Sequence, residues 1–523
     1  MTALLILIPL FAIIAILRGS DPRKTAQGAT GLMLVTGVTL ALLWQTGVKK
    51  SLAFSVPVLS KPSISLSLDF YDGMSVVMVL LSVIVSFAAA RSGKCEDQHA
   101  KLWYLAILLI AAGALGAFLA TDLFFFYAFH ELALIPTFLT IGLLGRGDRK
   151  EIAWKVTIYL AFGSIVLLAG LLWLVGASGA ENLGFEAILE SSIPTDAQRG
   201  IALFLLVGFG TLVSLFPFHS WAAPAYASAP APIAMLHAGV LKKFGLYGLL
   251  RLFPLVPEGM RGWLEFIIFL LLGNILWVGF VTISQKRLDT LLGNSSVMHM
   301  GYIFLAFAAL VDAGSEVGNP IAKPAAVLLM FGHGITVAML FGLADRIERQ
   351  TGTLELRDLG GLGKNAPSLA FLFGLAAMAS IGLPGLANFA GEVMVFIAGF
   401  RSWEPGTQFG WVQIATVFAL WGVVISAVYM LRAYRCIFQG GTTPTTENAT
   451  DLSPPDKRPA VVLATVLLVV GLFPNLILGF IEKPGDRKSA ARELPAPPSP
   501  QLSSTESAED PGRSAGSRIT NNE

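Results

Sequence analysis

Seven ionisable side chains lie inside long apolar stretches of the sequence, where a charge is costly. They are Glu131, His237, Lys242, Lys243, His299, His333 and Glu392. A charged side chain at mid-membrane costs about 2.5–3.5 kcal/mol on insertion scales, so such residues usually face a cavity or a partner and mark ion or proton paths. Acidic, basic and imidazole groups recur along the whole chain, whereas a pocket for an apolar ligand would need one cluster. This spread favours a hydrophilic axis that carries protons or small cations.

The two acidic members of this set each have a functional and a structural interpretation. Glu131 lies beside His130 in residues 122–145, an apolar stretch long enough to cross a bilayer as one helix. It could serve an ion path, or it could be a carboxylate tied to a neighbouring helix. Glu392 follows the sequence GLPG at residues 382–385. A half-helix beginning there would place its positive dipole end near Glu392, which could also simply cap that half-helix.

Three of the basic groups share one apolar stretch, Met235–Leu252. Lys243 comes six residues after His237, about 240° around a helix, so these two side chains do not share a face. Lys242 lies closer to the face of His237. Burial lets a lysine exchange its proton at a modest cost. Lys242 and Lys243 could alternatively snorkel to lipid headgroups.

His299 and His333 lie at similar depth in adjacent apolar stretches. A single histidine inside a membrane is more often a hydrogen-bonded packing residue. Two histidines in neighbouring spans favour a proton relay as strongly as packing. Both interpretations stay open at this point.

The composition indicates a membrane protein with many spans. Of its 523 residues, 54% are hydrophobic and 13% are charged, about half the charged fraction of a soluble protein. Two scattered cysteines cannot form a disulfide framework, an iron–sulfur cluster or a zinc site. The sequence has no phosphate-binding loop and no dinucleotide-binding glycine pattern. We therefore expect no cofactor and no metal on this chain.

Apolar runs separated by charged or Pro/Gly-rich breaks predict an all-α polytopic fold with about fourteen transmembrane helices. They lie near residues 2–17, 29–47, 73–90, 102–120, 122–145, 153–175, 200–217, 231–250, 262–283, 289–311, 323–344, 368–400, 411–436 and 460–481. The seventh is expected to break near Pro217 and the twelfth near Pro384. Interrupted helices at matching places in two halves point to inverted repeats, here five spans each.

Lys and Arg are concentrated in the breaks after odd-numbered spans, apart from the seventh, and this places those breaks in the cytoplasm and both termini outside. We expect the N-terminal helices at 1–100, the first repeat at 101–252, the second at 253–440, and a loop with the last helix at 441–482. Residues 483–523 are polar and rich in Pro and Ser, which predicts a disordered tail.

Several motifs resemble those of one family, the antiporter-like subunits of respiratory complex I. They are FYAFHELALIPTFLTIGLLG (126–145), FPFHSW (216–221), LKKFGLYGLLR (241–251), SSVMHMG (295–301) and GHG (332–334). GLPGLANFAGE (382–392) and LRDLGGL (356–362) are similar to the M-type chain, whereas the L-type chain and Mrp antiporters usually carry lysine near the position of Glu392. The resemblance covers about residues 70–440.

This resemblance implies fourteen helices with two inverted five-helix repeats, and it implies proton transfer. Glu131, Lys243 and Glu392 match the family's fifth-helix glutamate, eighth-helix lysine and twelfth-helix exit carboxylate. His299 and His333 match positions often assigned to the connecting relay; His237 and Lys242 are further candidates. The chain would be a proton-translocating subunit in a bacterial inner membrane, driven by quinone reduction in partner subunits.

The resemblance also implies which molecules act elsewhere in the assembly. NAD, FMN, iron–sulfur clusters and quinone would bind partner subunits of the membrane and redox arms, and nucleic acid is not an expected partner. Alternatives are a subunit of a related hydrogenase, carbon-uptake or Mrp-type antiporter complex, or a structural membrane module that has lost pumping.

The sequence departs from the family pattern at three places. Leu212 occupies the position of the seventh-helix lysine that pairs with the fifth-helix glutamate, and no Lys or Arg occurs in 201–221. The family's Pro-Asp-Ala-His reads Ala-Pro-Ala-Tyr at 223–226, and a basic pair reads Asp-Thr at 289–290. Without that lysine, Glu131 loses the attraction that would hold it ionised; His130 or Lys155 could substitute.

Overall fold

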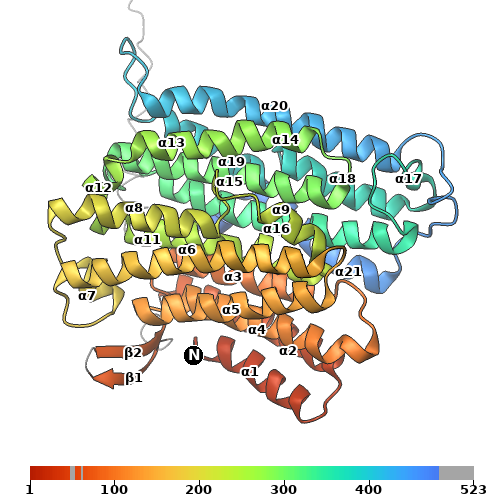
Figure 1. Cartoon of the computed structure of the whole chain (residues 1–523), viewed down its shortest axis with the longest axis horizontal. Coiled ribbons are helices and arrows are strands. Elements are labelled where there is room, and N and C mark those ends of the chain that lie inside the picture. Colours follow the sequence, from red (N-terminus) through yellow and green to blue (C-terminus); the bar gives the residue numbers. More distant parts are fainter. Residues whose placement is uncertain (48–52, 61–62, 482–523) are drawn as a thin grey trace, which may run out of the picture. The chain divides into compact units, whose positions relative to one another are not determined.

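The computed structural model describes residues 1–47, 53–60 and 63–481, and within them helices dominate (Figure 1). A helix satisfies its own backbone hydrogen bonds, which the apolar interior of a bilayer requires. The expected disordered tail at 483–523 lies outside the described residues.

The first half of the chain forms the helices that carry Glu131 and the lysine pair. Their bounds are α1 Leu4–Leu17, α2 Pro22–Gln45, α3 Gly73–Ala89, α4 Ala100–Leu119, α5 Leu123–Leu144, α6 Arg149–Ser178, α7 Phe185–Leu189, α8 Thr195–Leu212, α9 Ala222–Ser228, α10 Ala231–Gly239 and α11 Phe244–Leu252, with short 3₁₀ turns η1 Asp97–His99, η2 Leu241–Lys243 and η3 Phe253–Leu255.

The second half forms the helices that carry His299, His333 and Glu392. Their bounds are α12 Pro257–Arg261, α13 Leu264–Leu272, a π-helical turn η4 Gly273–Val278, α14 Gly279–Ile283, α15 Leu288–Ala313, α16 Ala322–Thr351, α17 Leu362–Asn365, α18 Pro367–Ile381, α19 Ala387–Phe400, α20 Trp411–Phe438, α21 Pro454–Leu472 and α22 Asn475–Ile481.

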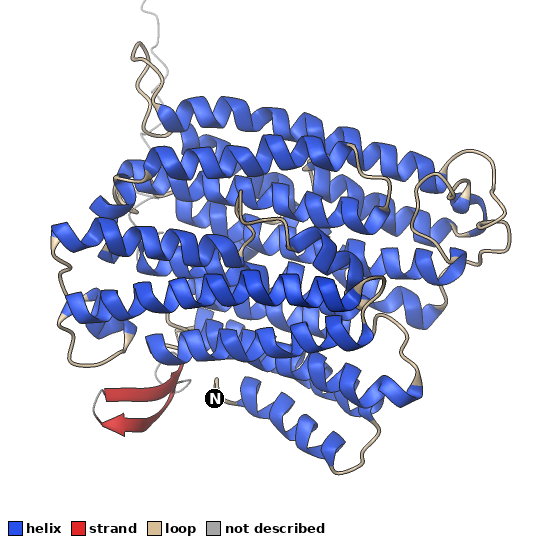
Figure 2. Cartoon of the chain, viewed as in Figure 1, coloured by secondary structure: helices blue, strands red, loops and turns tan. Residues whose placement is uncertain are grey.

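The expectation of a purely helical fold needs one correction. An antiparallel hairpin, β1 Phe54–Ser60 and β2 Ser63–Leu68, joins α2 to α3 (Figure 2). Its second strand reads SISLSL, with serine and aliphatic residues alternating. Because side chains alternate between the two faces of a strand, this period of two was the signal for the hairpin.

Among the described residues, nine helices are long and apolar enough to cross a membrane, or ten if α21 and α22, bent by 75°, count as one span. The fourteen expected spans include stretches that fold as shorter apolar helices: α1, α3, and the pair α18 and α19. The chain is therefore a multi-pass membrane protein.

Helices break at the two predicted places and at one that was not predicted. An irregular segment follows α8 at Leu212 before α9 begins, and α18 and α19 are separated at 382–386. There Gly382 and Gly385 have φ of 82° and 90°, a region that favours glycine. The expected continuous helix at 231–250 is instead divided by η2, which contains both Lys242 and Lys243.

Close contact between α10 and α16 brings the two halves together at this third break. A Cβ on Gly334 of α16 would lie 2.6 Å from the carbonyl oxygen of Gly239, the last residue of α10. Glycine at such a crossing lets two helix backbones approach. His333 precedes Gly334, and η2 follows Gly239, so this crossing positions the lysine pair against α16.

Candidate functional site

Lys243 and His333 form the centre of the site. Both side chains are buried, and Nζ of Lys243 lies 2.8 Å from Nδ1 of His333. The ammonium also donates to the carbonyl oxygen of Ala238 at 2.9 Å. That carbonyl is near the end of α10, where the helix break leaves carbonyl groups free to accept. Both residues were expected from the sequence, and the fold places them in direct contact.

His299 continues this chain of groups on α15. The rings of His299 and His333 are 5.6 Å apart between centroids. Nδ1 and Nε2 of His299 lie 2.7 Å from the carbonyl oxygens of Ser295 and Ser380 respectively. A carbonyl oxygen only accepts hydrogen bonds, so both contacts are satisfied only when both ring nitrogens carry hydrogen. This geometry suits a residue that holds an additional proton.

Glu392 stands at the far end of the site, on the second half of the broken helix. Its side chain is buried, and Oε1 has no hydrogen-bond partner within the part of the chain that is described. Ser380, whose carbonyl contacts His299, belongs to the first half, α18. The break therefore carries both the residue that holds His299 and the terminal carboxylate. It is an irregular backbone segment covered by protein, as a membrane requires.

Lys242 and His237 form a side branch of the site rather than part of its main line. Lys242 is buried and its ammonium donates to Ser296 Oγ at 3.4 Å, so it does not snorkel to a headgroup. Nδ1 of His237 lies 3.2 Å from the hydroxyl of Tyr226. Nε2 of His237 is buried with no partner among the described atoms. The two side chains share Tyr226, because Lys242 lies 5.6 Å from the centre of its ring.

Glu131 differs from the sequence expectation, which placed it among the buried groups. Its side chain is 34% exposed, and Ser164 Oγ of α6 donates to Oε1 at 2.6 Å. Nδ1 of the neighbouring His130 lies 3.5 Å from the same oxygen. The His130 ring in turn stacks on Phe244 at 3.8 Å. Phe244 follows Lys243, so His130 connects Glu131 to the centre by packing.

The residue at the position of the missing lysine lies on α8, which packs against α6, the helix whose Ser164 binds Glu131. Leu212 is buried and ends α8. Its neighbour Thr211 contacts Gly163, where a Cβ would lie 2.9 Å away, and Gly163 precedes the Ser164 that binds Glu131. Of the two substitutes considered, His130 contacts Glu131, whereas Lys155 forms no ion pair to a carboxylate of the described chain.

The fold thus brings Lys243, His333 and His299 into one line, with Glu392 beyond them at the helix break and Glu131 at the other side. Direct contacts link Lys243 to His333, and adjacent rings link His333 to His299. These groups can accept and release protons. Within the described residues no group of three or more His, Cys, Asp or Glu side chains is arranged to hold a metal ion.

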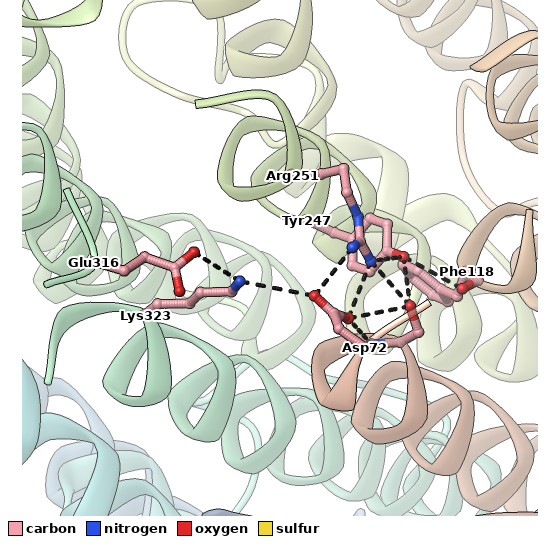
Figure 3. Close-up of polar contacts among 7 residues, drawn as sticks. Asp72, Phe118, Tyr247, Arg251, Glu316 and Lys323 are labelled. Atoms are coloured by element: carbon pink, nitrogen blue, oxygen red, sulfur yellow. Dashed lines mark hydrogen bonds and ion pairs between the residues drawn. The ribbon is translucent and has the colours of Figure 1, made fainter. Parts of the chain in front are cut away.

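A partly buried ionic cluster was not predicted from the sequence: Arg251 is 2% exposed, and Lys323 and Asp72 are 17% and 27% exposed. Arg251 of α11 binds the carboxylate of Asp72, which caps α3, through two hydrogen bonds of 3.0 and 3.1 Å, and Lys323 lies 3.7 Å from Asp72 on the other side (Figure 3). Burial raises the pKa of Asp72, but Arg251 and Lys323 outweigh it and lower that pKa to about 2. An arginine within the apolar run 244–252 was the available signal.

Comparison with known proteins places this geometry in a family. The sequence profile described as NADH:quinone oxidoreductase/Mrp antiporter, TM, matches residues 120–421, more than half of the chain. The chain belongs to this family. The match confirms the resemblance inferred from the motifs, and its range contains every residue of the proposed axis.

Two relatives are similar over most of this chain. NAD(P)H-quinone oxidoreductase chain 4 2 of Microcystis aeruginosa is 34% identical over 372 residues, which are 71% of this chain and 65% of that protein. The chain thus spans slightly less than two thirds of that relative's length. NAD(P)H-quinone oxidoreductase chain 4 1 of Synechococcus sp. (strain JA-3-3Ab) is 32% identical over 411 residues, 77% of this chain and 76% of the relative.

Two solved structures share the fold of this chain. A chain of respiratory complex I from Thermus thermophilus with bound NADH superimposes with a TM-score of 0.80 at 26% identity, covering 92% of this chain and 100% of that chain. A chain of the Mrp complex from Dietzia sp. DQ12-45-1b gives a TM-score of 0.76 at 20% identity and covers 92% of this chain and 96% of that chain. The second likeness concerns the fold alone.

Proposed function

We propose that this chain is the M-type, proton-translocating membrane subunit of a bacterial NADH:quinone oxidoreductase. The observation that carries the proposal is the buried contact of 2.8 Å between Lys243 and His333, continued by His299 toward Glu392. The similarity to proteins named NAD(P)H-quinone oxidoreductase chain 4, and to a chain of Thermus thermophilus complex I, supports the choice of assembly.

The proposal includes the finer architecture that the motifs imply. The chain crosses the bacterial inner membrane about fourteen times in two inverted five-helix repeats, 101–252 and 253–440, with both termini outside. The matching breaks at the ends of α8 and α18 support this arrangement. NAD, FMN, iron–sulfur clusters and quinone bind partner subunits, and this chain moves protons only.

The lysine–histidine pair is the centre of the proposed proton transfer. Two positive charges 2.8 Å apart repel by about 6 kcal/mol at an effective dielectric constant of about 20. Lys243 and His333 therefore hold one additional proton between them rather than two. When a second proton arrives at Lys243, the first therefore passes through His333 to His299.

His299 receives this proton because its two carbonyl contacts, Ser295 and Ser380, are both satisfied by the doubly protonated ring. Glu392 is the terminal acceptor, and its Oε1 has no competing hydrogen bond among the described groups. On the other side, Glu131 and His130 act as the inlet. Redox chemistry in the partner subunits changes the hydration and charge of this row and so gives the transfer a direction.

The proposal is tested in the native complex, purified with its partner subunits and reconstituted in sealed vesicles. Lys243→Met removes the titratable group but keeps the length of the side chain, and Lys150→Met is the matched control in an exposed position. We expect the first variant to lose most of the proton pumping attributable to this subunit, measured per quinone reduced, and the control to lose none. Normal pumping by Lys243→Met, with the complex intact, would refute the role assigned to the axis.

A second candidate function is a structural membrane module without pumping. The observation that favours it is the inlet side, where Leu212 replaces lysine and Glu131 is partly exposed beside one histidine.

Identification of the co-purifying subunits separates the quinone oxidoreductase from hydrogenase, carbon-uptake and Mrp-type assemblies. Pumping by the intact wild-type complex that is insensitive to every axis substitution would identify the structural module.

A further inference from the structure

A second polar row leaves Lys243 in a different direction from the histidines. Lys243, Tyr247 and Arg251 follow one another at intervals of four residues on η2 and α11, so they share one helix face, with neighbouring Cβ atoms about 5–6 Å apart. The row ends at Asp72, which caps the N-terminus of α3. It therefore leads from the centre of the site to one end of the bundle.

That end is the one that the charge bias places outside. The opposite end of α3 is followed by Arg91, Lys94 and Lys101, and α16 runs from Lys323 near Asp72 to Arg349 at its far end. Basic residues gather on the cytoplasmic side. Glu316, which binds Lys323 at 2.9 Å, is half exposed there. A proton travelling along this row would escape outward without passing His333, His299 and Glu392.

Hydrogen bonds connect the outer part of this row, from Tyr247 to Asp72, almost to the surface. The hydroxyl of Tyr247 lies 2.9 Å from Ser75 Oγ, and Ser75 Oγ donates to Asp72 at 3.3 Å. Figure 3 shows Asp72 between this group and Lys323, which in turn contacts Glu316. Hydroxyl groups can both accept and donate, so a row of them conducts protons unless its acceptor positions are occupied.

Arg251 occupies those positions. One of its terminal nitrogens, Nη2, donates to the oxygen of Tyr247 at 2.7 Å and to Ser75 Oγ at 3.0 Å, and also to Asp72 at 3.1 Å. A guanidinium has only donors and is not deprotonated in proteins. Its two hydrogens on Nη2, shared among these three oxygens, therefore compete with an incoming proton for the hydroxyl lone pairs, and the guanidinium cannot pass a proton on itself.

Aromatic rings and a carboxylate hold the guanidinium in this place. Its central carbon lies 4.4 Å from the ring centre of Tyr71, 5.0 Å from Tyr247 and 5.6 Å from Phe185, distances at which a cation is attracted to an aromatic ring. Asp72 accepts a further bond, of 3.0 Å, from the other terminal nitrogen, Nη1. The arginine side chain itself is almost completely buried, at 2% exposure.

We propose that Arg251 is a proton barrier that closes the outward end of the row from Lys243, so that protons can leave this subunit only by the histidine row and Glu392. This rests on the proposed function, because a barrier matters only where protons reach Lys243. Arg251 is a positioning residue in this scheme: it acts on the hydroxyls of Tyr247 and Ser75, while Asp72 and the aromatic rings fix it.

A proton barrier and a purely structural ion pair predict different results when Arg251 and Asp72 are substituted separately. Arg251→Met frees the hydroxyls, whereas Asp72→Asn leaves the guanidinium on them. If Arg251 is a barrier, the arginine variant leaks protons and the asparagine variant does not. If the pair only braces the helices, Asp72→Asn leaves an unpaired buried charge and disturbs the structure at least as much.

The experiment uses the whole complex in proteoliposomes with a pH-sensitive dye inside, a potassium-imposed membrane potential and no NADH. We expect Arg251→Met to raise the passive proton influx on the order of tenfold, which corresponds to lowering the barrier by about 1.4 kcal/mol. Asp72→Asn and the control Lys323→Met should stay near the wild-type rate. The double variant Asp72→Asn/Arg251→Met contains no unpaired charge and should leak as the single arginine variant does.

Assembly and quinone reduction are measured on the same preparations. If the intact double variant has the same passive proton influx as the wild type, the proposal is overturned. It is also overturned if Asp72→Asn leaks protons as fast as Arg251→Met. Because the influx is measured without turnover, a wild-type complex that fails to pump with NADH would count against the proposed function, whereas an unchanged resting influx in the arginine variants counts against the barrier.

Discussion

The carboxylate of Glu392 lies directly over Gly382, across the break between α18 and α19. A Cβ at Gly382 would overlap Oε2 of Glu392. Gly382 also has φ of 82°, a left-handed conformation that side chains other than glycine adopt at a cost. The break and the carboxylate therefore depend on the same residue.

We expect Gly382→Ala to displace Glu392 and to strain the break by about 1–2 kcal/mol. Proton pumping per quinone reduced should fall, while the complex should still assemble. Gly406→Ala is the matched control, because Gly406 also has positive φ, 93°, but a Cβ there meets no other atom within 4 Å. If both variants pump alike, the position of Glu392 over Gly382 has no role in transfer.

His299 provides a second prediction. His299→Gln keeps a polar side chain but cannot donate to the carbonyls of Ser295 and Ser380 from two ring nitrogens or hold a proton between them. We expect pumping per quinone to fall several-fold, with quinone reduction slowed to a smaller extent. The measurement is simultaneous dye-monitored acidification and quinone reduction in vesicles. Unchanged pumping would remove His299 from the axis and leave it as a packing residue.

Leu212→Lys would restore the basic group on the inlet side. Leu212 ends α8 next to Thr211, which contacts α6 beside the Ser164 that binds Glu131, so this substitution adds a basic group to the helix that packs beside the inlet. We expect more protons pumped per electron than in the wild type, and Leu212→Met as a control of similar length should show no gain. A loss of pumping in Leu212→Lys would mean that His130 already completes the inlet.

The ionic cluster at Asp72 should give a specific pH dependence of stability. Its pKa is about 2, below the ordinary value of 3.8, so the stabilisation by ionised Asp72 is fully present above the pKa of the unfolded chain and is lost as pH falls through about 2. We expect Asp72→Asn to lower the Tm of the detergent-solubilised complex by the same amount from pH 8 to about pH 5, with the gap narrowing only below about pH 4. If the Tm difference between the wild type and Asp72→Asn disappears near pH 6, another group dominates the pH dependence of stability.

Several elements of this protein followed from the sequence because they depend on local chemistry. Burying a charged side chain in an apolar run is costly wherever the run folds, so Lys243, His333 and Glu392 could be selected before their positions were known. The breaks near Pro217 and Pro384 follow from proline and glycine in the same way. The alternation of serine and aliphatic residues in SISLSL is an equally local signal, and it indicates the β-hairpin rather than a helix.

Contacts between distant segments could not be read from the same pattern. The pairing of Asp72 with Arg251, 179 residues apart, depends on how α3 and α11 are rotated. The partial exposure of Glu131 depends on which side of α5 meets α6. Neither rotation is encoded in the hydropathy of one segment.

The sequence by itself determined which ionisable side chains lie in apolar stretches and the family to which the chain belongs, because the cost of burying charge is a property of each residue and its neighbours in the chain. Only the tertiary structure decided which of these groups touch. The η2 break and the Gly239–Gly334 crossing bring Lys243 within 2.8 Å of His333. That distance is set by helix packing across the two halves of the chain. A proton moves directly only between groups that lie this close to each other.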